Sequence, residues 1–254
     1  MTAKVTAIIP TYNEEQHIAQ AIKSVDWADE IIVVDSFSTD RTVTIATKNP
    51  KVKLIQHEYQ NSAAQKNWII PQATHEWVFI LDADERVTDD LKTEIHHTLN
   101  NPTKSAYWIY RRNFFLGKEL KFIWKNDKVI RLFKKADYKY KSLAVHAKIE
   151  VHDPNLVGVM KYKLLHYTYK NTRHFLAKME TYAEWSAKDH DSNVKNVNIF
   201  YLFIKPISRF IKHYFVQLGF LDGYRGFIVS VLMSWGVFLR YVKMIELRRN
   251  SAKQ

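Results

Sequence analysis

The sequence predicts an α/β domain, in which helices flank a mostly parallel sheet, followed by a helical C-terminal extension. Short apolar runs alternate with helical periodicity over about the first ninety residues, which is the pattern of an open parallel sheet. A polar cluster follows three of these runs where a strand would end: Thr11–Glu15, Asp35–Asp40 and Asp82–Glu85. The extension is predicted by a change to aromatic and basic residues after Asn198.

The elements follow from the local pattern. The apolar runs are expected to be strands at Lys4–Ile9, Ile31–Val34, Val52–Ile55 and Trp77–Leu81. Helices are expected at Glu15–Val25, from Ser38 or Thr39 as a cap to about Lys48, at Asn61–Ile70, and from a Thr88 cap to about Leu99. In open α/β sheets ligands bind outside the carboxyl ends of the strands. The three polar clusters therefore predict one cleft lined by acids.

The run Val78–Arg86 is the centre of this prediction, because four apolar residues lead directly into Asp82-Ala83-Asp84. Two carboxylates at the end of a rigid strand can hold one divalent cation, and Mg²⁺ usually shares its shell with substrate phosphates. Asp-x-Asp by itself is common, and most copies are solvated turns or helix caps. The preceding strand and the other polar clusters are what favour a metal site here.

Composition narrows the function classes. The 254 residues carry a formal charge of +12, which suits nucleic acid, anionic lipid or a phosphorylated substrate. The absence of cysteine excludes disulfides and thiol chemistry. With six glycines and no glycine-rich phosphate loop, a dinucleotide or P-loop fold is not expected. The N-terminus lacks the regions of a signal peptide, so a cytoplasmic location is expected.

Three motifs in this order and spacing resemble the nucleotide-binding half of glycosyltransferase family 2. They are Ala7–Glu15, Ile32–Ser36 with Ser38–Asp40, and Asp82–Glu85. Three further segments are similar to the branch of lipopolysaccharide inner-core β-glucosyltransferases: Trp27–Glu30, Gln65–Asn67 and Phe220–Gly223. The resemblance covers nearly the whole chain, more loosely from Thr103 to Lys170.

The resemblance implies a GT-A (Rossmann-like) fold, inversion at the anomeric carbon, a UDP-sugar donor, and Mg²⁺ or Mn²⁺. It assigns nucleoside contacts to Pro10, Thr11, Glu14 and Asp35, a uracil or pyrophosphate contact to Lys66, ribose to Asp82 and the metal to Asp84. A bound cation suits this chemistry, because it stabilises the charge of the pyrophosphate leaving group.

The sequence departs from this branch at the catalytic base. The branch has a Val-His-Glu triplet, and this chain has Val145-His146-Ala147. Three explanations are open: a variant in which alanine replaces the acid, a nearby acid acting instead, or His146 taking the proton itself. The candidate acids are Asp127, Glu150 and Asp153.

Three other residues have two interpretations each. His166 is either a further metal ligand or a hydrogen-bonded core histidine. Trp124 either stacks on a sugar or is a buried aromatic. Arg131 is a candidate contact to acceptor or donor sugar. Arg111-Arg112 and Lys134-Lys135 either meet acceptor phosphates or form a solvated basic surface.

The C-terminal third predicts a helix at Thr172 to about His190, then two apolar helices, the second from Phe227 to about Val242. Lys205, Arg209 and Lys212 fall on one helical stripe, and residues 200–249 hold eight Lys or Arg against two acids, a net +6. Thirteen uncharged residues, Phe227–Leu239, are too few for a membrane span of roughly twenty. The pair is expected to lie on an anionic membrane; a packed hairpin or a dimer interface is the alternative.

The sequence thus predicts an inverting hexosyltransferase, peripheral at the inner face of the cytoplasmic membrane. Its expected donor is a UDP-sugar, and its acceptor a lipid-linked saccharide such as lipopolysaccharide inner core. Polyprenyl phosphate, another surface glycan, or a catalytically impaired nucleotide-sugar-binding variant are the alternatives. No nucleic-acid partner is expected, because the basic residues lie beside apolar ones. The expected divisions are 1–100 for the nucleotide-sugar-binding half, 101–190 for the acceptor-binding half and 191–254 for the extension.

Overall fold

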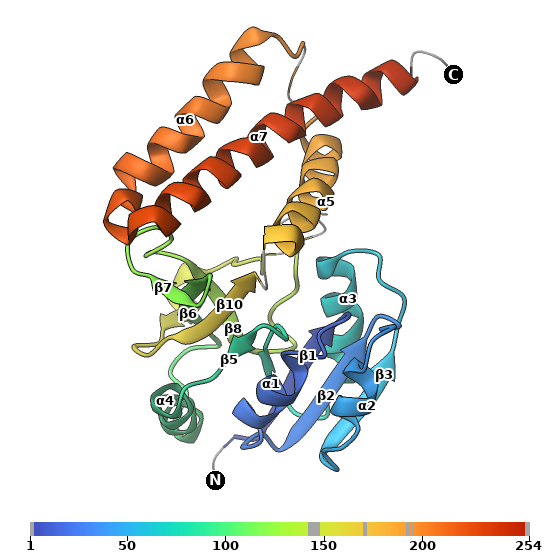
Figure 1. Cartoon of the computed structure of the whole chain (residues 1–254). Helices are drawn as coiled ribbons and strands as arrows, with labels where there is room; N and C mark the ends of the chain where they lie inside the picture. The colour runs from blue at the N-terminus through green and yellow to red at the C-terminus, as the bar shows by residue number, and fades with distance from the viewer. Residues whose placement is uncertain (1–2, 142–147, 170–171, 192–193, 195, 252–254) are drawn as a thin grey trace. The chain divides into compact units, whose positions relative to one another are not determined.

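A computed structural model describes residues 3–141, 148–169, 172–191, 194 and 196–251. The chain forms two compact units. The first comprises Met1–Arg112, Asn126–Ser142 and His146–Tyr167, and the second comprises Asn113–Lys125, Leu143–Val145 and Thr168–Gln254. Figure 1 shows the sheet elements of the first unit and the long helices of the second.

Across the described ranges the strands form one mixed sheet in the order β3-β2-β1-β4-β8-β6-β10-β5, and β7 and β9 also pair with β6. Its strands are β1 (Val5–Thr11), β2 (Glu30–Asp35), β3 (Val52–Gln56), β4 (Trp77–Ile80), β5 (Glu85–Arg86), β6 (Ala106–Phe115), β7 (Lys118–Leu120), β8 (Lys128–Lys134), β9 (Val157–Val159) and β10 (Leu164–Tyr169). Strands β1 to β4 pair in parallel, as predicted. β8 runs antiparallel to both β4 and β6.

The parallel strands are buried on both faces, which explains their continuous apolar runs. Ile31 and Val33 of β2 pack in one cluster with helices α1 (Ile18–Ser24), α2 (Thr42–Ala46) and α4 (Asp89–Asn100). Ile32 and Val34 of the same strand pack on the opposite face with α3 (Ser62–Ile69), which continues into the 3₁₀ turn η1 (Ile70–Gln72). The predicted α/β architecture is therefore confirmed.

Two predicted helix starts are confirmed and two are wrong. Asn61 caps α3 and Thr88 caps α4, each side chain accepting from the backbone NH three residues later. Helix α1 begins at Ile18 rather than Glu15, because Glu14 to His17 form a turn. Helix α2 begins at Thr42, since the predicted cap Ser38 donates its hydroxyl to Asp35 instead.

The second unit is mainly helical (Figure 1). Its helices are α5 (Thr172–His190), the π-helical η4 (Phe200–Ile204), α6 (Lys205–Ile211), the π-helical η5 (Lys212–Val216), the 3₁₀ turn η6 (Gly219–Asp222) and α7 (Gly223–Ser251). Helix α7 packs against α5 and α6, and it is longer at both ends than the predicted Phe227–Val242. A side chain at Gly226 would collide with the Gly219 carbonyl, at 1.8 Å, so glycine is required where α7 leaves the turn.

One helical segment, Gly219–Asn250, is long and apolar enough to cross a membrane, by length and composition. In its most apolar window 28% is buried inside the protein. The window has 18 residues and admits up to two charged ones, whereas the count of thirteen in the sequence stops at the first charge.

Candidate active site

The carboxyl ends of β1, β2 and β3 are in register, which places three polar side chains in one row. Thr11 of β1 pairs with Asp35 of β2, and Asp35 pairs with Gln56 of β3. The Gln56 amide donates to Asp35 Oδ2 at 3.1 Å. Asp35 itself is fully buried. The convergence of polar residues at the sheet edge is therefore present in the fold.

Asp35 organises the loop that follows it. Its Oδ2 accepts from the backbone NH of Ser38 at 3.0 Å, and its Oδ1 from the Ser38 hydroxyl at 2.5 Å. The Ser38 hydroxyl oxygen in turn accepts from the backbone NH of Asn13 at 2.9 Å. One buried carboxylate thus connects the loop after β2 to the loop after β1.

Asn13 and Phe37 both adopt left-handed backbone conformations, with φ of 52° and 59°. Asn13 is held there because its side-chain oxygen accepts from the backbone NH of Thr39 at 2.8 Å. Such conformations concentrate at functional sites. Tyr12 and Phe37, next to these fixed positions, are each 56% exposed and offer aromatic surface at the sheet edge.

Asp82 follows the end of β4, and two basic side chains pair with its carboxylate. Its Oδ1 accepts from Lys66 Nζ at 2.9 Å, and its Oδ2 accepts from the Arg131 guanidinium. Burial would raise the pKa of Asp82, but Arg131 and then Lys66 outweigh that effect and hold the pKa well below its usual range. Asp82 is therefore ionised at neutral pH while its side chain stays 33% exposed.

Glu85 is a further acid of the site, to which no individual role is assigned from the sequence. It is fully buried, and its Oε1 accepts from Arg131 at 2.7 Å and from Arg111 at 3.3 Å. Its Oε2 accepts from the Asp82 backbone NH at 3.1 Å. Burial would lower the pKa of Arg131, but Asp82 and Glu85 outweigh it and raise the pKa well above its usual value. Arg131, expected as a sugar contact, thus supports the Asp82 loop.

Asp127 is paired with Arg111, which donates to both of its oxygens at 2.9 and 2.7 Å. Arg111 is only 17% exposed and bridges Asp127 to Glu85, so it belongs to this network rather than to a solvated basic surface. The other candidate acids have local partners: Glu150 lies 3.9 Å from Lys139 Nζ, and Asp153 accepts from the Asn155 NH at 2.8 Å.

Asp84 and His166 meet through the pairing of β5 with β10. The antiparallel register sets His166 opposite Glu85, and the Tyr167 NH donates to the Asp84 carbonyl at 2.9 Å. As a result Asp84 Oδ2 and His166 Nε2 are 3.7 Å apart, with side chains 15% and 11% exposed. A carboxylate oxygen and an imidazole nitrogen suit Mn²⁺, whereas Mg²⁺ prefers oxygen alone.

Asp84 and His166 alone do not make a closed metal site. Among the residues that the structure describes, no group of three or more His, Asp or Glu is arranged to hold a metal ion. A cation at Asp84 and His166 would take its remaining ligands from water and from a phosphorylated ligand, which is how Mg²⁺ is commonly bound.

The remaining predicted residues are distributed as follows. Thr11 is buried and Pro10 half-buried in β1, and the Glu14 backbone NH donates to Thr42 Oγ1 at 2.7 Å. Trp124 belongs to the second unit, where it packs against the cluster that includes Phe115, with φ of 63°. His146 and Ala147 lie outside the described residues.

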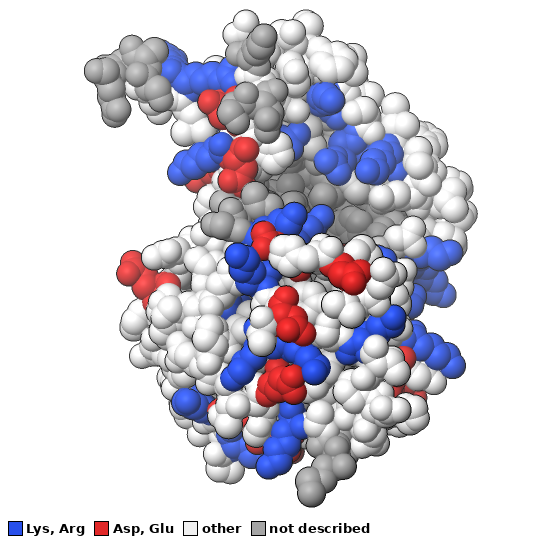
Figure 2. All heavy atoms as spheres, turned by 180° about the vertical axis from the view of Figure 1, so that it is seen from behind, with Lys and Arg blue, Asp and Glu red and all other residues white. Residues whose placement is uncertain are grey.

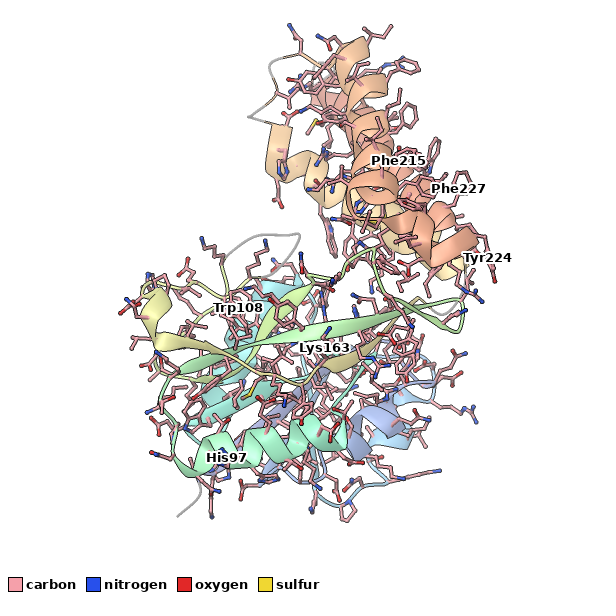
Figure 3. The ribbon with its side chains drawn as sticks, turned by 90° about the vertical axis from the view of Figure 1, so that its left-hand side faces the viewer. His97, Trp108, Lys163, Phe215, Tyr224 and Phe227 are labelled. Carbon is pink, nitrogen blue, oxygen red and sulfur yellow. The ribbon has the colours of Figure 1, made fainter. Side chains whose placement is uncertain are left out.

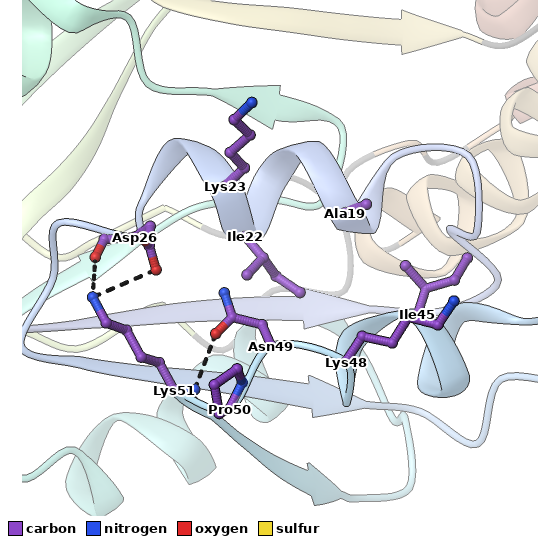
Figure 4. A pocket seen from close by; sticks show the side chains of 9 residues that line it. All are labelled: Ala19, Ile22, Lys23, Asp26, Ile45, Lys48, Asn49, Pro50 and Lys51. Atoms are coloured by element: carbon purple, nitrogen blue, oxygen red, sulfur yellow. Dashed lines mark hydrogen bonds and ion pairs between the residues drawn. The ribbon is translucent and has the colours of Figure 1, made fainter.

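Two surface hollows lie away from these acids. One, of about 590 Å³, lies between α1 and the residues from Ile45 to Lys51 (Figure 4). In it Lys51 Nζ contacts Asp26 Oδ1 at 3.5 Å. The other, of about 510 Å³, is lined by residues including Asn67, Tyr138 and His152. Neither includes Asp35, Asp82 or Asp84.

Comparison with known proteins now identifies the family. The family model described as Glycosyl transferase family 2 matches residues 6–154, more than half of the chain. The chain belongs to glycosyl transferase family 2. This family 2 chain is also 30% identical to the glycosyltransferase RT0209 of Rickettsia typhi, over 98% of this chain and 89% of that protein. It is 25% identical to the lipopolysaccharide core biosynthesis glycosyltransferase LpsC of Rhizobium meliloti, over 95% and 92%.

Solved structures share the fold. S. aureus TarS 1–349 in complex with UDP superposes with a TM-score of 0.52 at 16% identity, over 97% of this chain and 92% of that one. The mannosyltransferase PcManGT from Pyrobaculum calidifontis, in complex with GDP-Man and Mn²⁺, gives 0.52 at 17%, over 96% and 88%. The family 2 chain is thus a glycosyltransferase with a GT-A-like fold, as the sequence predicted.

Proposed function

We propose that this family 2 glycosyltransferase transfers a hexose, glucose in the first instance, from a UDP-sugar to a lipid-linked saccharide with inversion. The proposed UDP-sugar donor is supported by the position of Asp35, Asp82 and Asp84 at the same edge of the sheet. Lys66 and Arg131 hold Asp82 there through ion pairs. The complex of TarS with UDP supports the choice of nucleotide.

The nucleoside is assigned to the first two loops. Pro10, Thr11 and Glu14 would contact it, and Asp35 would meet the uracil or ribose edge. Asp35 is suited to this because three hydrogen bonds already fix its orientation. Lys66 would lie near the pyrophosphate while it holds Asp82, which would meet the ribose.

The metal is assigned to Asp84 and His166, with Mg²⁺ or Mn²⁺ as the cation. Their separation of 3.7 Å and low exposure fit two ligands of one ion, and the Mn²⁺ complex of PcManGT supports a divalent metal. When bound, the cation supplies a Lewis acid for the diphosphate leaving group. The buried Arg131 and Lys66 keep the neighbouring Asp82 ionised at neutral pH.

The proton acceptor is assigned to the segment that contains His146 and Ala147. Asp127, the other candidate, already receives two hydrogen bonds from Arg111, which favours a structural role for it. Ala147 stands where the resemblance has a glutamate, so His146 takes the proton in this chain or the rate is low. The absence of a carboxylate at position 147 is also the specific observation that favours a second function, nucleotide-sugar binding without efficient transfer.

The acceptor is assigned from LpsC, whose name places it in lipopolysaccharide core biosynthesis. Trp124 remains the proposed acceptor or sugar contact, whereas Arg131 is buried against Asp82 and Glu85 and is assigned the positioning of Asp82. A lipid-linked acceptor explains why the enzyme would act at the inner face of the cytoplasmic membrane. On the face in Figure 2, Lys and Arg are interspersed with Asp and Glu over the first unit, which does not favour a nucleic-acid partner.

Thermal shift with UDP-, GDP- and CMP-sugars, each with and without Mn²⁺, tests the donor and the metal. We expect stabilisation by UDP-sugars that depends on Mn²⁺ and that is lost when Asp82 and Asp84 are both changed to Asn. The proposal fails if UDP binds equally well in that variant or with all cations chelated. Turnover on lipid-linked saccharides, compared with polyprenyl phosphate, then separates the acceptors, and metal-dependent UDP binding without turnover on any of them favours the binding-only function.

A further inference from the structure

The turn between α6 and α7 exposes an unusual number of large apolar side chains. Seven residues of this turn are 43% to 72% exposed, and we call them the apolar tip: Phe215, Val216, Leu218, Phe220, Leu221, Tyr224 and Phe227. Figure 3 shows Phe215, Tyr224 and Phe227 extending from the same side of the helical hairpin. Monomeric soluble proteins rarely expose so contiguous an apolar surface without a partner.

The apolar tip is held in place by the residues behind it. The Tyr214 ring contacts the rings of Phe215, Phe220 and Phe227 at centroid distances of 5.1, 6.2 and 5.7 Å. His213 is buried, and its Nδ1 lies 2.8 Å from Gln217 Oε1. Since these contacts fix the backbone, the tip presents its apolar side chains without needing to refold.

The charges around the apolar tip are mainly positive. Lys212 is exposed at its start, and the Arg225 guanidinium lies 4.5 Å from the Tyr224 ring centroid. The acid of the turn, Asp222, accepts from the backbone NH groups of Lys121, Phe122 and Ile123 at 2.8, 3.1 and 2.9 Å, so peptide dipoles compensate its charge. Aromatic rings beside Lys and Arg are the composition found where proteins meet lipid headgroups.

The exposed apolar surface continues from the tip along the hairpin. On the η4 and α6 side it includes Phe203, Ile207 and Ile211, which are 46% to 56% exposed. Helix α7 packs against α5 and α6, so lipid cannot surround it on all sides as it surrounds a single spanning helix. This geometry suits a hairpin that enters one leaflet by its turn.

We propose that the apolar tip inserts into the headgroup layer of an anionic membrane, with Lys212 and Arg225 at the level of the lipid phosphates. This inference names the part of the chain that would contact the membrane. It rests on the proposed function only in that a lipid-linked acceptor gives the enzyme a reason to bind a membrane. The sequence predicted electrostatic docking through the basic stripe of Lys205, Arg209 and Lys212. In the present proposal the apolar side chains provide most of the binding free energy, and the positive charges select anionic lipid.

Vesicle co-sedimentation of the full chain tests the proposal. The test variant is Phe215→Ser, Phe220→Ser and Tyr224→Ser together, and the matched control is Tyr59→Ser, Leu156→Ser and Val159→Ser, which are 41% to 57% exposed in the first unit. On vesicles of phosphatidylcholine mixed with phosphatidylglycerol, we expect the test variant to bind on the order of tenfold or more weaker and the control to bind as the wild type does. Phosphatidylcholine alone should bind the wild type weakly.

A site-specific label gives a second measurement that does not depend on removing the apolar residues. Because the chain has no cysteine, Phe220→Cys carries a single environment-sensitive dye, and Val159→Cys is its control. We expect a blue shift on mixed vesicles for position 220 and none for position 159. A shift at neither position, or equal shifts at both, overturns insertion by the tip.

The remaining outcomes are also decisive. Wild-type protein that ignores mixed vesicles, or a test variant that binds as the wild type does, overturns the proposal. If sedimentation velocity shows a dimer that the test variant loses, the tip is a contact between copies of the chain instead. Stabilisation by UDP is measured in parallel on the wild type, so wild-type protein that binds mixed vesicles but is not stabilised by UDP counts against the proposed function and not against docking.

Discussion

His166 Nε2 lies 3.7 Å from Asp84 Oδ2, although Asp84 lies in the turn before β5 and His166 lies in β10, far apart in the sequence. The pairing of β5 with β10 produces this approach, because it sets His166 opposite the residue after Asp84. This distance fits both interpretations of His166, a metal ligand beside Asp84 and a core histidine paired with the Asp84 carboxylate. A metal-binding measurement distinguishes the two.

His166→Ala is expected to weaken Mn²⁺ affinity by on the order of tenfold or more, because it removes one of the two proposed protein ligands. Titration of Mn²⁺ followed by electron paramagnetic resonance measures the change without requiring turnover. The exposed His152 is the control, and His152→Ala should bind Mn²⁺ as the wild type does. Equal affinity of His166→Ala and the wild type would remove His166 from the proposed site.

Arg131→Met is expected to lower the free energy of unfolding by about 3–5 kcal/mol, because it leaves buried Glu85 without one of its partners. Denaturant unfolding at neutral pH measures the loss. Arg41→Met removes an exposed ion pair with Glu15 and should cost about 1 kcal/mol or less. A loss for Arg131→Met no greater than that of Arg41→Met would contradict the network.

The pH dependence of stability follows from Asp82. Its pKa is lowered in the folded protein, so its pairing with Arg131 and Lys66 stabilises the fold above the ordinary aspartate pKa of 3.8. That stabilisation is lost as the pH falls below this value, towards the lowered folded-state pKa. Asp82→Asn should therefore flatten the acid limb of the unfolding profile below about pH 4, and an unchanged limb would contradict the pairing.

Ala147→Glu is expected to raise the transfer rate by about 10²-fold or more, because a positioned general base contributes on that order. Single-turnover transfer from the UDP-sugar measures the change, and thermal shift by UDP should stay the same. Ala147→Gln is the matched control, with similar size and no carboxylate. If Ala147→Glu gives no increase, position 147 is not the missing base.

Asp222→Ala is expected to lower the free energy of unfolding by more than one hydrogen bond contributes. The reason is that three backbone NH groups lose a charged acceptor. Hydrogen exchange at Lys121, Phe122 and Ile123 should become faster in this variant. Glu246→Ala, on an exposed ion pair of α7, is the control and should leave this segment protected. If hydrogen exchange at these three residues is unchanged in Asp222→Ala, the Asp222 carboxylate does not hold this segment.

Local signals predicted the nucleotide half of the fold well. Buried parallel strands read as continuous apolar runs, and the Asn61 and Thr88 caps lie at the helix starts that their side chains indicate. The start of helix α2 was misplaced because the Ser38 hydroxyl has two hydrogen-bonding options, and the local one with Asp35, three residues earlier, prevails over capping the helix.

Long-range pairings were the part that periodicity does not encode. Strand β5 has two residues, which is too short to carry an alternating pattern. Its pairing with β10 therefore cannot be predicted from hydrophobic periodicity. For the same reason Arg111 and Arg131 read as basic surface or sugar contacts, whereas the fold turns both onto buried Glu85. Three acids in four residues, Asp82 to Glu85, were the signal that cationic partners would be needed.

The amide clamp of Asp222 has a practical consequence for protein engineering. One carboxylate at the start of the last helix secures a peptide segment 100 positions earlier in the chain. The helical hairpin therefore cannot be transferred to another protein as an independent segment. A chimera that grafts it onto another transferase must bring Lys118–Lys125 along, because otherwise Asp222 loses the backbone NH groups from which it accepts hydrogen bonds.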